Sequence, residues 1–249
     1  MFELNCRDSV VVIKLDHRIT NVINLKLVKD MIDVVRDVKS DPRHKALILS
    51  SSNEKFFSIG FDIPGLYKLD RKDFQVFYRS FNQLCLELFT LPKPTAAAMT
   101  GHAIAGGCIL ALCCDYRIIS RGRTLMGLNE VKLGVPVPYL AYSILVSLIG
   151  SGRADEMAEK GDFYQPEELL KMGLVNRVAD PDDVLSGAVD HVLSLASMPL
   201  ETYMLNKRKR VETIKTDFFK HREEMQEIFI RDWFSDKARR LLVEAMDKF

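Results

Sequence analysis

The sequence predicts an α/β fold in which pairs of strands alternate with helices. Residues 2–16 alternate around Asp8-Ser9, and Val10 to Leu15 are nearly all apolar or β-branched, which is typical of a hairpin of two strands. Residues 27–38 then carry apolar side chains at helical spacing and end at a proline-containing turn. The order strand, strand, helix recurs after that, and this rhythm is the basis of the predicted fold class.

The remaining elements of the first 198 residues follow from the same signals. Apolar runs bounded by turn residues predict strands, and longer stretches with helical spacing predict helices. We expect strands at 45–50, 55–59, 94–99, 115–120 and 175–178, and helices at 71–89, 138–149, 152–160 and 166–172.

From about residue 199 the sequence changes to long, charged, amphipathic helices. Large apolar residues recur near every fourth position of this region, namely Phe218, Met225, Phe229 and Trp233. Such a stripe needs a surface to pack against. It lies either on another copy of the chain or on the core of its own chain, and the sequence does not separate the two.

Composition limits the class of protein. The chain has 249 residues, 47% of them hydrophobic and 28% charged, with a net charge of +1, as in an ordinary soluble globular protein. Nothing in the overall charge favours nucleic acid or a membrane surface as partner. No apolar run is long enough to span a membrane and no export signal begins the sequence, so we expect a cytoplasmic protein.

Cysteine and histidine usage gives no sign of a metal. The five cysteines have no paired Cys-x-x-Cys spacing and mostly apolar neighbours, so we expect reduced thiols in the core. The five histidines are scattered along the chain rather than set at ligand spacing.

The stretch from Thr100 to Asp115 has the most informative pattern. Gly106-Gly107 lies between a predicted strand and a predicted helix, where missing side chains allow close approach to the backbone. The free N–H groups at a helix start favour negative charge. The pattern fits an anion pocket, or alternatively a tight turn that binds nothing.

Two motifs together resemble the enoyl-CoA hydratase/isomerase (crotonase) superfamily. They are Phe-Ser-x-Gly-x-Asp at 57–62 and Gly-x-x-x-x-Gly-Gly at 101–107, followed by Cys114-Asp115. The resemblance implies a crotonase-type spiral core, (ββα)n, over residues 1–198. It also implies a C-terminal helical region, 199–249, that caps the active site and builds a homotrimer or a dimer of trimers. The substrate would be an acyl-CoA, with no separate cofactor.

The resemblance also assigns roles to residues. The backbone N–H groups of Ile59 and Gly106 would form an oxyanion hole, which stabilises the charge that builds on the thioester oxygen of an enolate. Glu130 would be the catalytic base, since a carboxylate in an apolar cleft has a raised pKa. Residues expected around the substrate and its CoA are Lys55, Phe57, Gly60, Asp62, Gly107, Ile109 and Lys248.

One departure from the family's hydratases bears on the reaction. They carry a second glutamate three residues after the oxyanion-hole glycine, and this chain has Ile109 there. A single glutamate is the pattern of the 3,2-trans-enoyl-CoA isomerases, so we expect a shift of 3-enoyl-CoA to 2-trans-enoyl-CoA. The alternatives are enoyl-CoA hydration, thioester hydrolysis or decarboxylation, and a non-catalytic oligomeric binding protein.

Several other polar residues have more ordinary interpretations. We expect His102 to be structural or solvent-facing, Asp62 to hold its own loop, and Tyr67, Tyr78 and Tyr139 to line the cleft. The basic run 207–210 stands among acidic residues, so we interpret it as a solvated helix face and predict no nucleic-acid partner.

Overall fold

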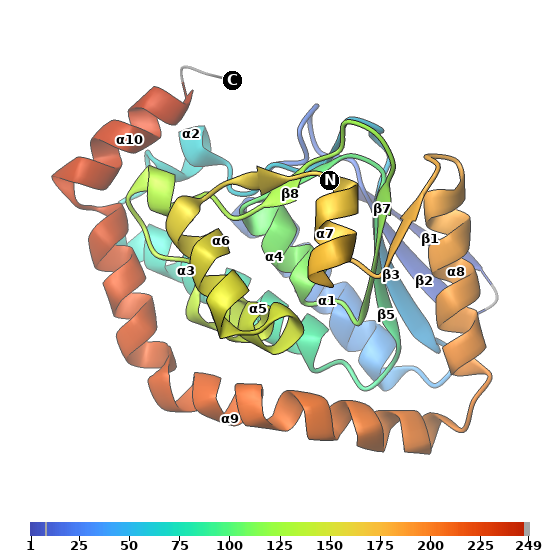
Figure 1. Ribbon diagram of the computed structural model, residues 1–249. Coiled ribbons are helices and arrows are strands. Elements are labelled where there is room, and N and C mark those ends of the chain that lie inside the picture. The colour runs from blue at the N-terminus through green and yellow to red at the C-terminus, as the bar shows by residue number, and fades with distance from the viewer. Residues whose placement is uncertain (8, 247–249) are drawn as a thin grey trace.

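Two sheets with helices on their outer faces form the molecule (Figure 1). The structure is a computed structural model and describes residues 1–7 and 9–246. The larger sheet has six strands in the order β1-β2-β3-β5-β7-β10. Its β1–β2 hairpin is antiparallel and its other pairings are parallel. These strands are β1 (Phe2–Arg7), β2 (Val10–Leu15), β3 (Ala46–Ser51), β5 (Thr95–Met99), β7 (Tyr116–Ser120) and β10 (Arg177–Ala179).

The second sheet is small and lies beside the functional motifs. Its four strands are β4 (Phe56–Ser58), β6 (His102–Ile104), β8 (Met126–Gly127) and β9 (Phe163–Tyr164), in that order. The first three are parallel, and β9 runs antiparallel to β8.

The chain moves between the two sheets in a repeated pattern. Each turn contributes one strand to the larger sheet, one to the smaller sheet, and then a helix. The three turns are β3, β4 and α3 (Arg71–Phe89), then β5, β6 and α4 (Gly106–Leu112), then β7, β8 and α5 (Tyr139–Ile149). This arrangement confirms the predicted α/β fold with a (ββα)n spiral core.

Local sequence signals explain where the main helices begin. The side chain of Asn24 accepts a hydrogen bond from the Leu27 N–H at the start of α1 (Leu25–Ser40). Asp70 caps α3 in the same way, through the Asp73 N–H. Two further helices are α6 (Ser151–Lys160) and α7 (Pro166–Met172), the latter with a capping box.

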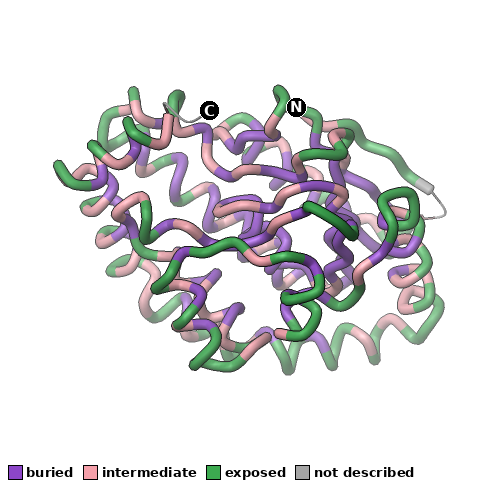
Figure 2. The backbone as a smooth tube through the Cα atoms, turned by 45° about the horizontal axis from the view of Figure 1, so that its top comes forward, coloured by how far each residue is buried: buried purple, intermediate pink, exposed green. Residues whose placement is uncertain are grey.

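The larger sheet is covered on both faces. Large apolar side chains of α1, α3 and α4 belong to the main core, which is continuous through the interior (Figure 2). On the other face α8 (Asp183–Ala196), a helix that we did not predict, packs on the small side chains of Ala96 and Ala98 and on Val10.

The C-terminal region consists of the long helix α9 (Leu200–Trp233) and α10 (Asp236–Met246) (Figure 1). Its apolar stripe is buried within the chain: the Phe229 ring stacks on Tyr78 at 4.1 Å, and Trp233 stacks on Phe74 at 4.5 Å. The stripe therefore packs on its own core, and the predicted trimer stays a prediction. Within the described part of the chain, no helix has the length and apolar character needed to cross a membrane.

A buried ionic cluster fixes the first half of α9 to the core. Asp115 accepts hydrogen bonds from Lys207 at 2.7 Å and from Tyr203 and Thr95 at 2.9 Å each, and it pairs with Arg210. Burial by itself would raise the pKa of Asp115, but Lys207 and Arg210 outweigh burial and lower it. The prediction of a solvated face over 207–210 was wrong for Lys207, which is buried against a carboxylate that is distant in sequence. Arg210 pairs with the same carboxylate but stays exposed, as predicted.

Candidate active site

The Gly-Gly motif lies at the start of α4, immediately after β6. Ala105, which precedes the helix, has φ 47° and ψ −118°, a conformation that residues with a side chain rarely adopt. Its own N–H donates to the Gly127 carbonyl oxygen at 2.9 Å. The N–H of Gly106 donates to no acceptor among the described residues. The motif therefore presents the Gly106 N–H as a free backbone donor at a helix start.

Both glycines of the motif touch the segment that follows β4. A Cβ on Gly107 would lie 2.2 Å from the Ser58 carbonyl oxygen, which no side chain tolerates. A Cβ on Gly106 would lie 3.2 Å from the Gly60 Cα and from the Phe61 ring. The two predicted motifs are thus in direct contact, although residues 63–100 lie between them in the sequence.

The hydrogen bonds require a correction to the predicted oxyanion hole. The Ile59 N–H donates to the Thr20 carbonyl oxygen at 3.1 Å, so it is not free to bind a ligand. The free donor on this segment is the N–H of Phe61. The Ile23 N–H donates to the Gly60 carbonyl oxygen and the Asp62 N–H donates to the Ile23 carbonyl oxygen, whereas the Phe61 N–H between them has no acceptor among the described residues. Ile59 and Phe61 both flank Gly60, and nothing in the sequence distinguishes them.

Glu130 begins η1, a single 3-10 turn (Glu130–Leu133) after β8. It is 5% exposed, and one of its carboxylate oxygens, Oε2, has no hydrogen-bond partner. Burial raises its pKa from 4.5 to about 7, offset in part by a hydrogen bond from its own backbone. A carboxyl group with this pKa can both accept and donate a proton near neutral pH.

Among the described residues, no second acid acts on Glu130. Its pKa is shifted by burial, and no neighbouring carboxylate contributes. Burial raises the pKa values of Cys108 and Tyr78, and the negative charge of Glu130 raises them further. Ile109, beside Cys108 on α4, is 1% exposed. The position at which the family's hydratases carry a second glutamate is therefore occupied by a buried apolar side chain.

The C-terminal helix α10 packs against both halves of this site. It contacts η1, which carries Glu130, and α2 (Ile63–Leu66), which begins directly after Phe61 and Asp62. The contact with η1 is close: a Cβ on Gly134 would lie 3.2 Å from the Ala238 Cα. The last described helix therefore lies against the elements that carry the candidate site, and the predicted role of this region as a cap stays a prediction.

Three of the other predicted substrate residues have structural partners. Phe57 is fully buried, and its carbonyl oxygen accepts from the Asn21 side chain at 3.1 Å. Asp62 caps α2 through the Gly65 N–H and forms an ion pair with Arg18 at 3.5 Å, as expected for a loop-holding residue. Lys55 is exposed, and its ammonium group lies 5.2 Å from the Phe56 ring. Lys248 lies outside the described residues.

His102 has the structural role that we expected. Its Nδ1 accepts a hydrogen bond from the Leu125 N–H at 3.0 Å, which joins the loop before β8 to β6. Burial lowers its pKa, and so does the nearby charge of Lys55. The ring therefore stays neutral near pH 7.

The three tyrosines differ in position. Tyr78 is buried, whereas the Tyr139 hydroxyl donates to Asp217 on α9 at 2.5 Å. Tyr67 ends α2 and stacks against the guanidinium group of Arg239 on α10. Of the three, Tyr78 is the one that the structure brings within electrostatic reach of Glu130.

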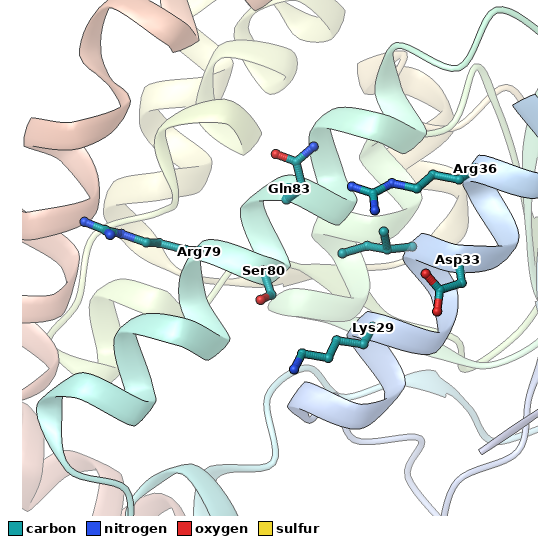
Figure 3. A pocket seen from close by; sticks show the side chains of 7 residues that line it. Lys29, Asp33, Arg36, Arg79, Ser80 and Gln83 are labelled. Atoms are coloured by element: carbon teal, nitrogen blue, oxygen red, sulfur yellow. The ribbon is translucent and has the colours of Figure 1, made fainter.

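A surface groove of about 420 Å³ lies elsewhere, between α1 and α3. Figure 3 shows charged side chains of both helices along it, among them Lys29, Asp33 and Arg36 from α1 and Arg79 from α3. None of the predicted site residues lines it. Among the described residues, no group of three or more His, Cys, Asp or Glu side chains is placed to hold a metal ion.

The spiral core and the two touching glycine motifs define a crotonase-type acyl-CoA enzyme. The pattern of the enoyl-CoA hydratase/isomerase family matches residues 5–249, and the chain belongs to this family.

The relatives in this family include both isomerases and hydratases. The chain is 29% identical to mouse mitochondrial enoyl-CoA delta isomerase 1 over 216 residues, 86% of this chain and 75% of the relative. It is 31% identical to crotonyl-CoA hydratase of Syntrophomonas wolfei over 201 residues, 79% of this chain and 75% of the relative. Human mitochondrial delta3-delta2-enoyl-CoA isomerase has the same fold, with a TM-score of 0.94 and 24% identity over 99% of this chain and 97% of that one.

Proposed function

We propose that this protein shifts the double bond of a 3-enoyl-CoA to give the 2-trans-enoyl-CoA, with Glu130 as the one proton carrier. The observation that carries the proposal is a buried glutamate with a pKa of about 7 and an unpartnered oxygen, with no second acid among the causes of its shift. The isomerase relatives support the same reaction.

The reaction needs one proton to move between two carbon atoms. The Glu130 carboxylate takes a proton from C2 of the 3-enoyl thioester, and the electron pair of that C–H bond delocalises into a dienolate. The protonated Glu130 then returns the proton to C4, so that the double bond ends between C2 and C3. No water or cofactor is consumed, and the carboxylate is regenerated.

The negative charge of the dienolate gathers on the thioester oxygen. In the proposed site, the free N–H groups of Phe61 and Gly106 donate to that oxygen. Each such preplaced donor typically lowers the barrier by about 3 to 4 kcal/mol. Because these are backbone groups on touching segments, the glycine contacts keep them in place.

Hydration is the second candidate, and the S. wolfei hydratase relative favours it. It would require a water molecule to be held and polarised on one face of the double bond. Ile109 offers no hydrogen bond for that purpose. We therefore place hydration second, with the water held by some group other than a second glutamate.

The test uses 3-hexenoyl-CoA and crotonyl-CoA with the wild-type protein and with Glu130→Gln. We expect the first substrate to become the conjugated 2-enoyl thioester with no change in mass, and the variant to lose about 10²-fold to 10⁴-fold in rate. Tyr142→Phe, which removes a hydroxyl bound to Asp155 on α6, is a control expected to retain activity. Addition of one water to crotonyl-CoA at a comparable rate would instead identify a hydratase.

A further inference from the structure

The contact between α10 and α2 holds a charged side chain that is only partly paired. The Nη2 atom of Arg239 donates to the Tyr67 carbonyl oxygen at 2.7 Å, and its guanidinium carbon lies 3.4 Å from the centroid of the Tyr67 ring. The Nη1 atom is buried and has no partner. No carboxylate among the described residues forms an ion pair with Arg239.

Arg239 stands where three parts of the candidate site meet. Its neighbour Ala238 packs on Gly134 at the end of η1, and Arg239 itself contacts Tyr67 at the end of α2. The start of η1 carries Glu130, and the residues before α2 carry the free Phe61 N–H. Figure 1 shows α10 beside α2 at this corner of the molecule.

Other unpartnered polar atoms gather in the same region. Buried side-chain nitrogen and oxygen atoms are nearly always hydrogen-bonded in native proteins. The described residues contain five exceptions, and four of them lie at the start of η1, at the end of α9 or in the first turn of α10: Asn129 Oδ1, Glu130 Oε2, Trp233 Nε1 and Arg239 Nη1. Helix α10 contacts both η1 and α9, so a polar ligand held beside α10 would supply missing partners.

We propose that Arg239 binds an anionic oxygen group of the acyl-CoA substrate. A guanidinium group pairs with a phosphate or carboxylate through parallel hydrogen bonds, and Nη1 is free to donate such bonds. Two parts of an acyl-CoA carry this chemistry: the phosphates of the CoA, or a carboxylate at the far end of the acyl group. The inference rests on the proposed function in that the ligand is an acyl-CoA, but it concerns binding and not proton transfer.

Binding measurements by calorimetry distinguish the two sources. The ligands are pentanoyl-CoA, pentanoyl-pantetheine, which lacks the phosphates, and glutaryl-CoA, which adds a terminal carboxylate to a five-carbon acyl group. The proteins are the wild type, Arg239→Gln, and Arg240→Gln as a matched control, because Arg240 is the adjacent exposed arginine of the same helix.

If Arg239 holds a phosphate, Arg239→Gln weakens pentanoyl-CoA binding by about 30-fold or more and leaves pentanoyl-pantetheine unchanged, since the loss of one partner of a buried charged hydrogen bond has at least this effect. If Arg239 holds a carboxylate, Arg239→Gln weakens the binding of glutaryl-CoA by the same factor and leaves the other two affinities unchanged. Arg240→Gln changes none of the three affinities.

Equal affinities of the wild type and Arg239→Gln for all three ligands would overturn the proposal and leave Arg239 as a residue that only holds α10 against α2. Arg239→Lys provides a second variant if Arg239→Gln unfolds: it keeps the charge, loses the paired donors, and is expected to weaken binding of the same ligand by about tenfold. Because these ligands undergo no double-bond shift, the result does not depend on whether the isomerase reaction is correct.

Discussion

Gly60 and Gly106 come so close that a Cβ on Gly60 would lie 2.8 Å from the Gly106 nitrogen. That nitrogen carries one of the two N–H groups proposed to bind the thioester oxygen, and the residue after Gly60 carries the other. One contact therefore sets the separation of both donors. It joins the segment after β4 to the start of α4.

Replacing Gly60 by alanine tests the importance of this contact. The φ of Gly60 is 91°, so alanine is strained there, and its methyl group also pushes against backbone that cannot rotate away. We expect Gly60→Ala to lower the free energy of unfolding by about 3 kcal/mol and to reduce the turnover of 3-hexenoyl-CoA by more than tenfold.

Gly122→Ala is the matched control for that variant. Gly122 has a similar φ of 99° and nothing within 4 Å of the added methyl group, so it reports the backbone strain alone. Denaturant unfolding of both variants separates strain from contact. Equal losses of stability, with activity retained in Gly60→Ala, would show that the contact does not set the donors.

The pKa of Glu130 predicts how activity depends on pH. The proposed base acts in its ionised form, and burial places its pKa at about 7. We expect kcat/KM for 3-hexenoyl-CoA to rise with pH through a midpoint near 7 and then level off. A midpoint near the ordinary glutamate value, about 4.5, would mean that the group acting as base is solvated or is a different carboxylate.

The same pKa predicts that the stability of the fold decreases as pH rises. A carboxyl group in an ion pair, whose pKa is lowered, would have the opposite effect. The folded protein holds a proton on Glu130 between about pH 4.5 and 7, where the unfolded chain has released it, so folding stability falls as pH rises through this window. The wild type should lose this free energy of unfolding as pH rises, and Glu130→Gln should not. We therefore expect the difference in the free energy of unfolding, variant minus wild type, to increase by about 3 kcal/mol from about pH 4 to pH 8, because a pKa shift of this size has that free-energy equivalent.

Urea unfolding at the two pH values measures this gain. Comparing the variant with the wild type at the same pH cancels the contributions of all other titrating groups to the free energy of unfolding. A constant difference between variant and wild type would show that Glu130 has an ordinary pKa in the folded protein.

The buried ionic cluster predicts which lysine of the basic run matters for stability. Lys207→Met leaves the Asp115 carboxylate buried with one cation fewer, and we expect a loss of about 3 kcal/mol. Lys209→Met, on the exposed side of the same helix, should change stability by less than about 0.5 kcal/mol. Similar effects of the two substitutions in thermal unfolding would contradict the arrangement of α9.

Sequence reasoning predicted those parts of the fold that depend on local signals. The limits of α3, 71–89, agree with the structure because Asp70 caps a long amphipathic stretch. Strands β6, β8 and β9 were not predicted, and each has only two or three residues. Helix α8 was missed although its residues are apolar at helical spacing.

Those parts of the candidate site that lie in local sequence motifs were predictable as well. Glu130 and Gly106 lie in recognisable motifs, and the structure gives one a buried carboxylate and the other a free N–H. The choice between Ile59 and Phe61 depends on a hydrogen bond from Ile59 to Thr20, a residue of a distant loop. The burial of Lys207 likewise depends on Asp115, 92 residues away in sequence. Neither pairing leaves a local signal.

Ala105 provides a last prediction, because its backbone conformation is one that glycine adopts far more readily. Its φ of 47° and ψ of −118° place a strained residue directly before the free N–H of Gly106. We expect Ala105→Gly to raise the free energy of unfolding by up to about 1 kcal/mol, since relief of strain exceeds the added freedom of the unfolded chain. Activity should fall at the same time, because a flexible residue holds the Gly106 donor less firmly. Thermal unfolding and turnover of 3-hexenoyl-CoA, measured on the same preparation, test both parts. A variant that is less stable than the wild type would mean that the surrounding contacts leave Ala105 unstrained.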